Sequence, residues 1–118
     1  MEECGATCGT DCNFDFHDAK VMSVSCGDNC HATCHDGVSC GAFCGANSGY
    51  SCWNTERCGV RAGAGSMVSC NNVQSCVVEC LGACQVFCTD EVASCEVNCP
   101  DGAAPMSCSN GALACGSC

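Results

Sequence analysis

Residues 70–99 read CNNVQSCVVECLGACQVFCTDEVASCEVNC and contain seven cysteines. Three times in it a valine stands midway between two cysteines, at Val78, Val86 and Val97. Side chains alternate between the two faces of an extended strand, so residues i, i+2 and i+4 share one face. The stretch therefore predicts short strands that present cysteine and valine together to an interior.

The same alternation runs through most of the chain. The first fifteen cysteines, from Cys4 to Cys88, all have even numbers, and small apolar residues such as Ala32 and Val60 share this parity. Most Gly, Ser, Asn, Thr and His residues before Cys88 are odd-numbered. The parity then changes once, over residues 89–94, as a one-residue bulge or a longer corner would cause. We therefore expect inward and outward positions to stay in phase through many turns.

Coils of even length would keep this phase. A helix would not, because gaps of six and fourteen residues between cysteines rotate to another side of a helix, and 14 glycines disfavour one. The steps between cysteines predict coils of ten to thirteen residues, with turns at Asp36-Gly37, Asp101-Gly102 and Asn110-Gly111. Glycine often follows cysteine, which predicts corners that need a positive φ at glycine.

The pattern predicts a small disulfide-rich all-β protein, a short β-solenoid or solenoid-like stack with inward cysteines. Two parts are expected, 1–58 and 70–118, joined by a Gly/Ala-rich connector at 59–69 within one continuous domain. The alternative is a pair of disulfide-linked helical hairpins, which the spacing of four between cysteines in residues 4–36 would also allow. A precursor peptide awaiting thioether modification is a further alternative, although no leader segment is evident.

Covalent bridges must replace a normal core, because the chain of 118 residues has 20 cysteines, two Leu and no Ile. The even count allows ten disulfides, each worth roughly 2–4 kcal/mol, and indicates an oxidising compartment. We expect an extracellular or cell-surface protein; no signal peptide stands in this numbering. The expected structural disulfide cysteines are Cys4, Cys8, Cys12, Cys26, Cys30, Cys34, Cys40, Cys44, Cys52, Cys58, Cys70, Cys76, Cys80, Cys84, Cys88, Cys95, Cys99, Cys108, Cys115 and Cys118.

The net charge of −10, with Lys20, Arg57 and Arg61 as the cations, argues against nucleic acid and anionic membranes as partners. No apolar run approaches the roughly 20 residues of a membrane-spanning helix.

Metal binding is the main alternative to disulfides. Nine cysteine gaps have the form C-x3-C, which on a helix could present thiolates to Cu(I), and a cysteine-rich protein could sequester Cu(I) or Zn. The C-x2-C motif of this chain, Cys115 to Cys118, could be a redox pair, but a disulfide that fastens the last coil is the simpler interpretation. His31 and His35 are weak metal candidates beside a turn, and no cofactor is expected.

No catalytic motif appears, and the chain is not expected to be an enzyme. His17 lies between Asp15 and Asp18, which indicates a solvated turn rather than a site. The acidic pair Asp90-Glu91 lacks the spacing of a calcium-binding loop.

The C-x-V-x-C pattern followed by a turn resembles disulfide-rich β-solenoid repeat proteins, such as the hyperactive beetle antifreeze proteins. The resemblance covers cysteine placement over 26–58 and 70–115. It implies the solenoid fold, but not ice binding, because the Thr-x-Thr motif of those proteins does not occur here.

Several large apolar residues have the outward parity and should point away from the cysteine interior, unless they cover it at corners. Such a surface predicts self-association into a filament or coat, so we expect a structural or surface-assembly protein. Besides metal sequestration, a secreted effector, toxin or ice-active module remains an alternative. The outward apolar residues are Phe43, Trp53, Met67, Leu81 and Phe87.

Overall fold

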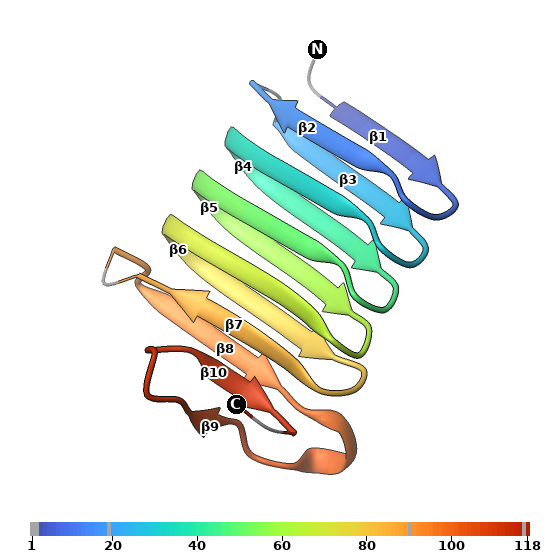
Figure 1. The fold of residues 1–118 in the computed structure, drawn as a ribbon. Helices are drawn as coiled ribbons and strands as arrows, with labels where there is room; N and C mark the ends of the chain where they lie inside the picture. The colour runs from blue at the N-terminus through green and yellow to red at the C-terminus, as the bar shows by residue number, and fades with distance from the viewer. Residues whose placement is uncertain (1–2, 19, 90, 117) are drawn as a thin grey trace.

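The computed structural model describes residues 3–18, 20–89, 91–116 and 118, and Figure 1 shows a stack of strands in two layers. No α-helix occurs in these residues, so the helical-hairpin alternative is wrong and the predicted all-β solenoid is confirmed. The elements are β1 (Glu3–Cys8), β2 (Asn13–His17), β3 (Val21–Cys26), β4 (His31–Cys44), β5 (Gly49–Ala62), β6 (Ser66–Cys80), β7 (Cys84–Cys88), β8 (Ser94–Asn98), η1 (Pro100–Gly102), β9 (Met106–Ser107) and β10 (Leu113–Cys115).

Each of the long strands β4, β5 and β6 bends once and contributes to both layers (Figure 1). We call the layer that contains β2, β7 and the first halves of β4–β6 the first sheet. The second sheet contains β1, β3, β8 and the second halves of β4–β6. All pairing inside these sheets is parallel, except that β10 pairs antiparallel with β7 and β9.

The coil repeats after 18 positions, because side chains of neighbouring coils that hydrogen-bond to each other are 18 residues apart. The predicted coil length of ten to thirteen residues is therefore wrong. Strand pairing has the same period, since Cys34 pairs with Cys52 and Cys40 pairs with Cys58. The prediction failed because most steps between successive cysteines measure the width of one coil rather than the distance between coils. Since the period is even, each coil turns the same parity inward, which explains the alternation in the sequence.

The predicted change of parity over residues 89–94 is confirmed. Pairing of β6 with β7 joins Cys70 to Cys88 and keeps the period of the earlier coils. Pairing of β6 with β8 joins Ser75 to Ser94, which is one position longer. One extra residue in the last corner therefore switches the inward positions from even to odd numbers.

Disulfides close the coils across their interior, at both ends of the strands. Their Cα–Cα distances are 6.0–6.6 Å, a separation that a disulfide can span. Loops this short give each bridge about 2 kcal/mol in the chain-entropy account. The coil-closing pairs are Cys8–Cys12, Cys26–Cys30, Cys34–Cys40, Cys52–Cys58, Cys70–Cys76, Cys80–Cys84 and Cys88–Cys95.

Two further disulfides, Cys99–Cys115 and Cys108–Cys118, hold the C-terminal segment. The structure therefore contains nine disulfides rather than ten among the described side chains, and it corrects the expectation for Cys44, whose thiol is free and buried. The reason is local: Cys44 faces Ser48 where the neighbouring coil has the Cys26–Cys30 bridge. The side chain of Cys4 lies outside the described part of the chain.

Two buried serines, Ser48 and Ser66, stand in the two coils after the Cys26–Cys30 bridge, at the position that Cys30 has in its own coil. Ser48 Oγ accepts a hydrogen bond from the backbone N–H of Cys30, and Ser66 Oγ accepts one from the N–H of Ser48, each at 3.2 Å. Ser66 Oγ also donates to the carbonyl of Gly45 at 3.1 Å. These hydroxyls satisfy backbone groups that would otherwise be buried without partners.

Asp and Asn, rather than glycine after cysteine, provide most of the left-handed backbone at the corners. Their side chains tolerate positive φ better than most L residues. Each corner repeats this residue once per coil, with φ of 53–79°. The two series are Asp11, Asn29, Asn47 and Gly65 at one corner, and Asp18, Asp36, Asn54 and Asn72 at the other.

Glycine has a different role at the first corner, where neighbouring coils lie very close together. A Cβ on Gly27 would lie 2.6 Å from the carbonyl oxygen of Gly9, and a Cβ on Gly63 would lie 2.6 Å from the carbonyl carbon of Gly45. The expectation of positive φ is met at Gly116, with φ of 89°. The turns predicted at Asp36, Asp101 and Gly111 also have positive φ.

Residues 59–69, predicted as a connector, contain the end of β5, one corner and the start of β6. Strand pairing continues through them, as Gly59 pairs with Val77 and Met67 with Gly49. No helix in the described residues is both long and apolar enough to cross a membrane.

Replacing Asn54 tests the corner ladder. Asn54 has φ of 53°, donates to Asp36 Oδ1 at 3.3 Å and accepts from Asn72 Nδ2 at 2.7 Å. We expect Asn54→Ala to lower the free energy of unfolding by about 2–3 kcal/mol, and Asn54→Gly to cost less, because glycine keeps the backbone conformation.

Urea unfolding of the oxidised chain, followed by circular dichroism, measures both changes. Asn98→Ala is the control, since Asn98 is an exposed asparagine without positive φ, whose amide donates to Glu96 at 3.4 Å. Equal losses for Asn54→Ala and Asn98→Ala would contradict the ladder.

Candidate functional site

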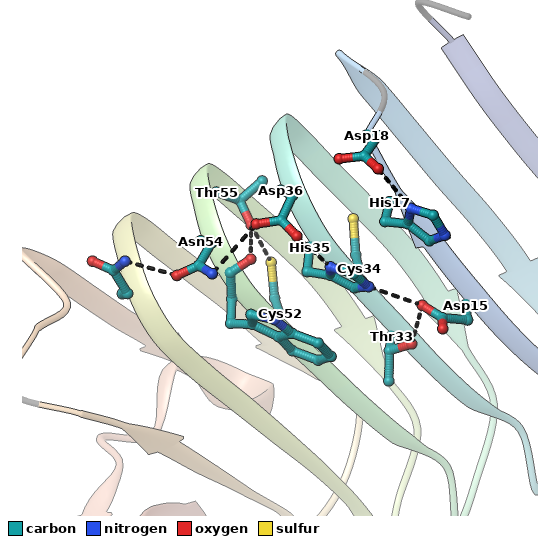
Figure 2. A network of polar contacts seen from close by, with 12 residues as sticks. Asp15, His17, Asp18, Thr33, Cys34, His35, Asp36, Cys52, Asn54 and Thr55 are labelled. Carbon is teal, nitrogen blue, oxygen red and sulfur yellow. Dashed lines mark hydrogen bonds and ion pairs between the residues drawn. The ribbon is translucent and has the colours of Figure 1, made fainter.

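A polar and aromatic cluster lies on the outer face of the first sheet, beside the second corner (Figure 2). His17 pairs with His35 and His35 pairs with Trp53 in the strand register, so the three side chains stand one above another. The rings of His17 and His35 are stacked with centroids 5.1 Å apart, and those of His35 and Trp53 with centroids 4.5 Å apart and planes within 3°. We call these three residues the ring column.

Carboxylates surround the imidazole of His35. Its Nδ1 lies 2.7 Å from Asp36 Oδ2 and its Nε2 lies 3.2 Å from Asp15 Oδ1, which also accepts from Thr33 Oγ1 at 3.0 Å (Figure 2). The side chain of His35 is 19% exposed. Each ring nitrogen of His35 therefore has a carboxylate oxygen as its hydrogen-bond partner.

The neighbouring pairs shift two pKa values. The hydrogen bond between His17 and Asp18, 2.9 Å long, raises the pKa of His17 above its ordinary value of 6.5 against the opposing effect of desolvation, and the charges of Asp18, Asp15 and Asp36 add to the rise. The hydrogen bond from His35 lowers the pKa of Asp36 below its ordinary 3.8, and Asn54 contributes in the same direction. Both shifted groups are exposed, so their contribution to stability is small.

The two predicted metal candidates do not form one site. His31 and His35 point outward from the same strand, but they stand four positions apart, about 13 Å along the strand. His31 lies against Gly49, where a Cβ would be 2.9 Å from its Nδ1. His17, expected in a solvated turn, instead joins the ring column. The pairing of His17 with His35 was missed because the true coil period was not recognised.

Cysteines make up every close group of three potential metal ligands among the described residues, with Sγ atoms within 4.8 Å of one another. The groups form because the coil-closing cysteines of adjacent coils stand in columns. Cys115 and Cys118 do not form a redox pair with each other; each bridges to another cysteine, and these two disulfides fasten the C-terminal segment. The groups are Cys12, Cys26 and Cys30; Cys40, Cys52 and Cys58; Cys70, Cys76 and Cys88; and Cys80, Cys84 and Cys115.

The flat outer faces of the two sheets each have a shallow hollow. On the first sheet a groove of about 370 Å³ runs along the small residues Thr33, Ser51 and Ser69, with Met67 and Phe87 on its border. On the second sheet a hollow of about 340 Å³ lies over several residues, among them Gly41, Gly59, Arg61, Val77 and Glu79.

Three exposed apolar side chains lie on the outer face of the second sheet, in different columns of the strand register. Val21, Phe43 and Val77 are 43%, 45% and 37% exposed on its outer face. Arg61 lies 5.5 Å from the ring centre of Phe43 and forms an ion pair with Glu79 at 3.3 Å.

The predicted outward orientation of large apolar residues is confirmed for Phe43, Met67 and Leu81, which are exposed, while Trp53 and Phe87 are half-buried. Of the acidic pair Asp90-Glu91, Asp90 lies outside the described residues.

Comparison with protein-family models, curated proteins and solved structures found no significant match to this chain.

An NMR titration of His17 tests the electrostatics of the ring column. We expect Asp18→Asn to lower the pKa of His17, because the charge of Asp18 is lost. Since the folded pKa of His17 is raised, the pair's contribution to stability is complete below pH 6.5 and is lost as the pH rises through the folded value. Asp28→Asn, at the other corner, should leave the titration unchanged. An unchanged His17 pKa in Asp18→Asn would disprove the assignment.

Proposed function

We propose that this chain is a non-enzymatic structural protein of an oxidising, extracellular compartment, which assembles with its own copies into a surface layer or filament. The observation that carries the proposal is the set of exposed apolar side chains on the flat outer face of the second sheet. Three of the exposed large apolar residues lie there, and Gly41 and Gly59 leave the surface between them open. Exposed apolar side chains on a flat face favour contact with another protein surface.

The charge distribution supports contact through this face. The described outward side chains on the strands of the second sheet include Arg57 and Arg61, which offset Glu79 and Glu96, although the chain as a whole has a net charge of −10. Most other acidic residues lie at corners, where their like charges would disfavour contact between the corners of two copies. These corner and loop residues include Asp11, Asp18, Asp28, Asp36, Glu56, Glu91 and Asp101.

The disulfides support the proposed compartment. Nine bridges, seven of which close individual coils, are consistent with an extracellular location, where bridges persist. A stack with so few large apolar residues depends on them for stability, which suits a durable structural role.

Metal sequestration is the second candidate, and the cysteine columns favour it specifically. Cys40, Cys52 and Cys58 are buried and bring three sulfur atoms within 4.8 Å, an arrangement that soft Cu(I) could use if the sulfurs were thiolates. The two candidates exclude each other at each site, because a sulfur in a disulfide is not a thiolate ligand.

Sedimentation of the oxidised chain over a range of concentrations tests the proposal. We expect self-association that Phe43→Asp with Val77→Asp weakens at least about tenfold, because two charges are placed in an apolar contact. Ser51→Asp with Ser69→Asp adds the same charge to the first sheet and should have little effect.

A chain that stays monomeric at every concentration would overturn the assembly proposal. A chain that is isolated with all its thiols free and with bound Cu(I) would establish metal sequestration instead.

A further inference from the structure

The two ends of the stack differ in how their interior is covered. At the C-terminal end, β10 pairs with the outer edge of β7, and β9 pairs with β10 (Figure 1). Two disulfides fix this segment, and the interior residues of the last coil, such as Val86 and Val97, are buried. The first sheet is therefore covered at this end.

The N-terminal end is open. β1 pairs only with β3 and β2 only with β4 among the described residues, so the outer edges of both strands keep free backbone N–H and C=O groups (Figure 1). All four described inward side chains of the first coil are only half-buried, whereas the next residue in each column is buried. The half-buried residues are Cys8, Cys12, Phe14 and Phe16.

We infer that a second copy of this chain docks on this open end, N-terminal coil to N-terminal coil, in a two-fold dimer. The inference deepens the proposed function and rests on it, because it supplies one of the contacts of the assembly. A dimer of this kind adds a strand to each open edge and covers the stacked rings of Phe14 and Phe16, whose centroids are 5.7 Å apart.

The geometry of the end selects a copy of the chain as the occupant. A partner must offer two strand edges, one for each sheet, separated by the thickness of a coil and with apolar groups between them. The same end of another copy meets all three conditions. The C-terminal end does not present the two edges of one coil, because β10 and β9 extend the first sheet beyond β7 while β8 remains the edge of the second sheet; a contact between two N-terminal ends therefore fits better and closes on itself.

Charge and parity also favour one register. In an antiparallel pair of β2 strands about the two-fold axis, inward residues must face inward residues. At least two registers meet this condition. One sets Phe16 opposite the partner's Phe16 and Asp15 opposite the partner's His17, twice across the axis. The other sets Phe14 opposite the partner's Phe16, twice, and Asp15 opposite the partner's Asp15. Opposite charges across neighbouring strands stabilise the pair, whereas a shift of one residue on each strand would place Asp15 against the partner's Asp15.

Sedimentation velocity of the oxidised chain at about 0.15 M salt, where distant charges are screened, tests the inference. We expect a dimer whose dissociation constant rises at least about tenfold in Phe16→Asp and stays nearly unchanged in Phe16→Leu. Met106→Asp, on exposed β9 at the C-terminal end, is the matched control and should not weaken the dimer.

Hydrogen exchange of the unaltered chain gives a second readout that does not depend on the variants. Backbone amides in residues 3–8 and 13–17 should exchange more slowly as the concentration rises through the dimer range. Rapid exchange of both strands at every concentration would overturn the inference.

The failures of the two proposals are distinguishable. One possible outcome is assembly that Phe43→Asp with Val77→Asp weakens, while Phe16→Asp has no effect and the amides of β1 and β2 exchange rapidly at every concentration. This outcome would overturn the dimer and leave the proposed function intact. A chain that dimerises through β1 and β2 but forms nothing larger would support the inference and overturn the proposal of a surface layer or filament.

Discussion

The fold depends on one constraint: every full coil from β2 to β7 has the same even length, so chemically similar side chains stand directly above one another at the strand spacing. Cys34, Cys52, Cys70 and Cys88 form one such column, and pairing in register is what allows each coil to close with its own disulfide. The asparagines and aspartates at the corners follow the same period. With valine and alanine as most of its other interior residues, the stack obtains its order from this repetition and from covalent closure rather than from a large core.

Much of this architecture could be predicted from the sequence. Even-numbered cysteines and the change of parity over residues 89–94 identified strands, an interior and the longer corner. Coil length was not found, because Cys34 and Cys40 lie in one coil while Cys34 and Cys52 lie in successive coils, and the nearer pair dominates a list of cysteine spacings. The signal that gives the length is the series Asp36, Asn54 and Asn72, which has no cysteine in it. Cys44 was expected in a bridge because parity says nothing about the residue opposite it.

The candidate site follows from the same period, and it was missed for the same reason. His17, His35 and Trp53 are far apart in a linear reading and adjacent in the stack. His31 and His35, which look close in the sequence, are separated along one strand. The ends of the stack were also not predictable from the sequence: the antiparallel β10, which covers β7 at one end, has no counterpart in the parallel coils, and at the other end Phe14 and Phe16 stay half-buried. Assembly through the second sheet and the open end is therefore an inference from structure.

Tryptic digestion of the unreduced chain, after free thiols are alkylated in denaturant at low pH, tests whether each coil closes with its own disulfide. Trypsin cleaves after Lys20, Arg57 and Arg61, the chain's only cationic side chains apart from histidine. Disulfides that close single coils predict three separate products: 1–20, 21–57 joined to 58–61 by Cys52–Cys58, and 62–118. Bridges between coils, such as Cys8 to Cys26 or Cys58 to Cys76, would link these products to one another, and mass spectrometry of such linked products would contradict the account.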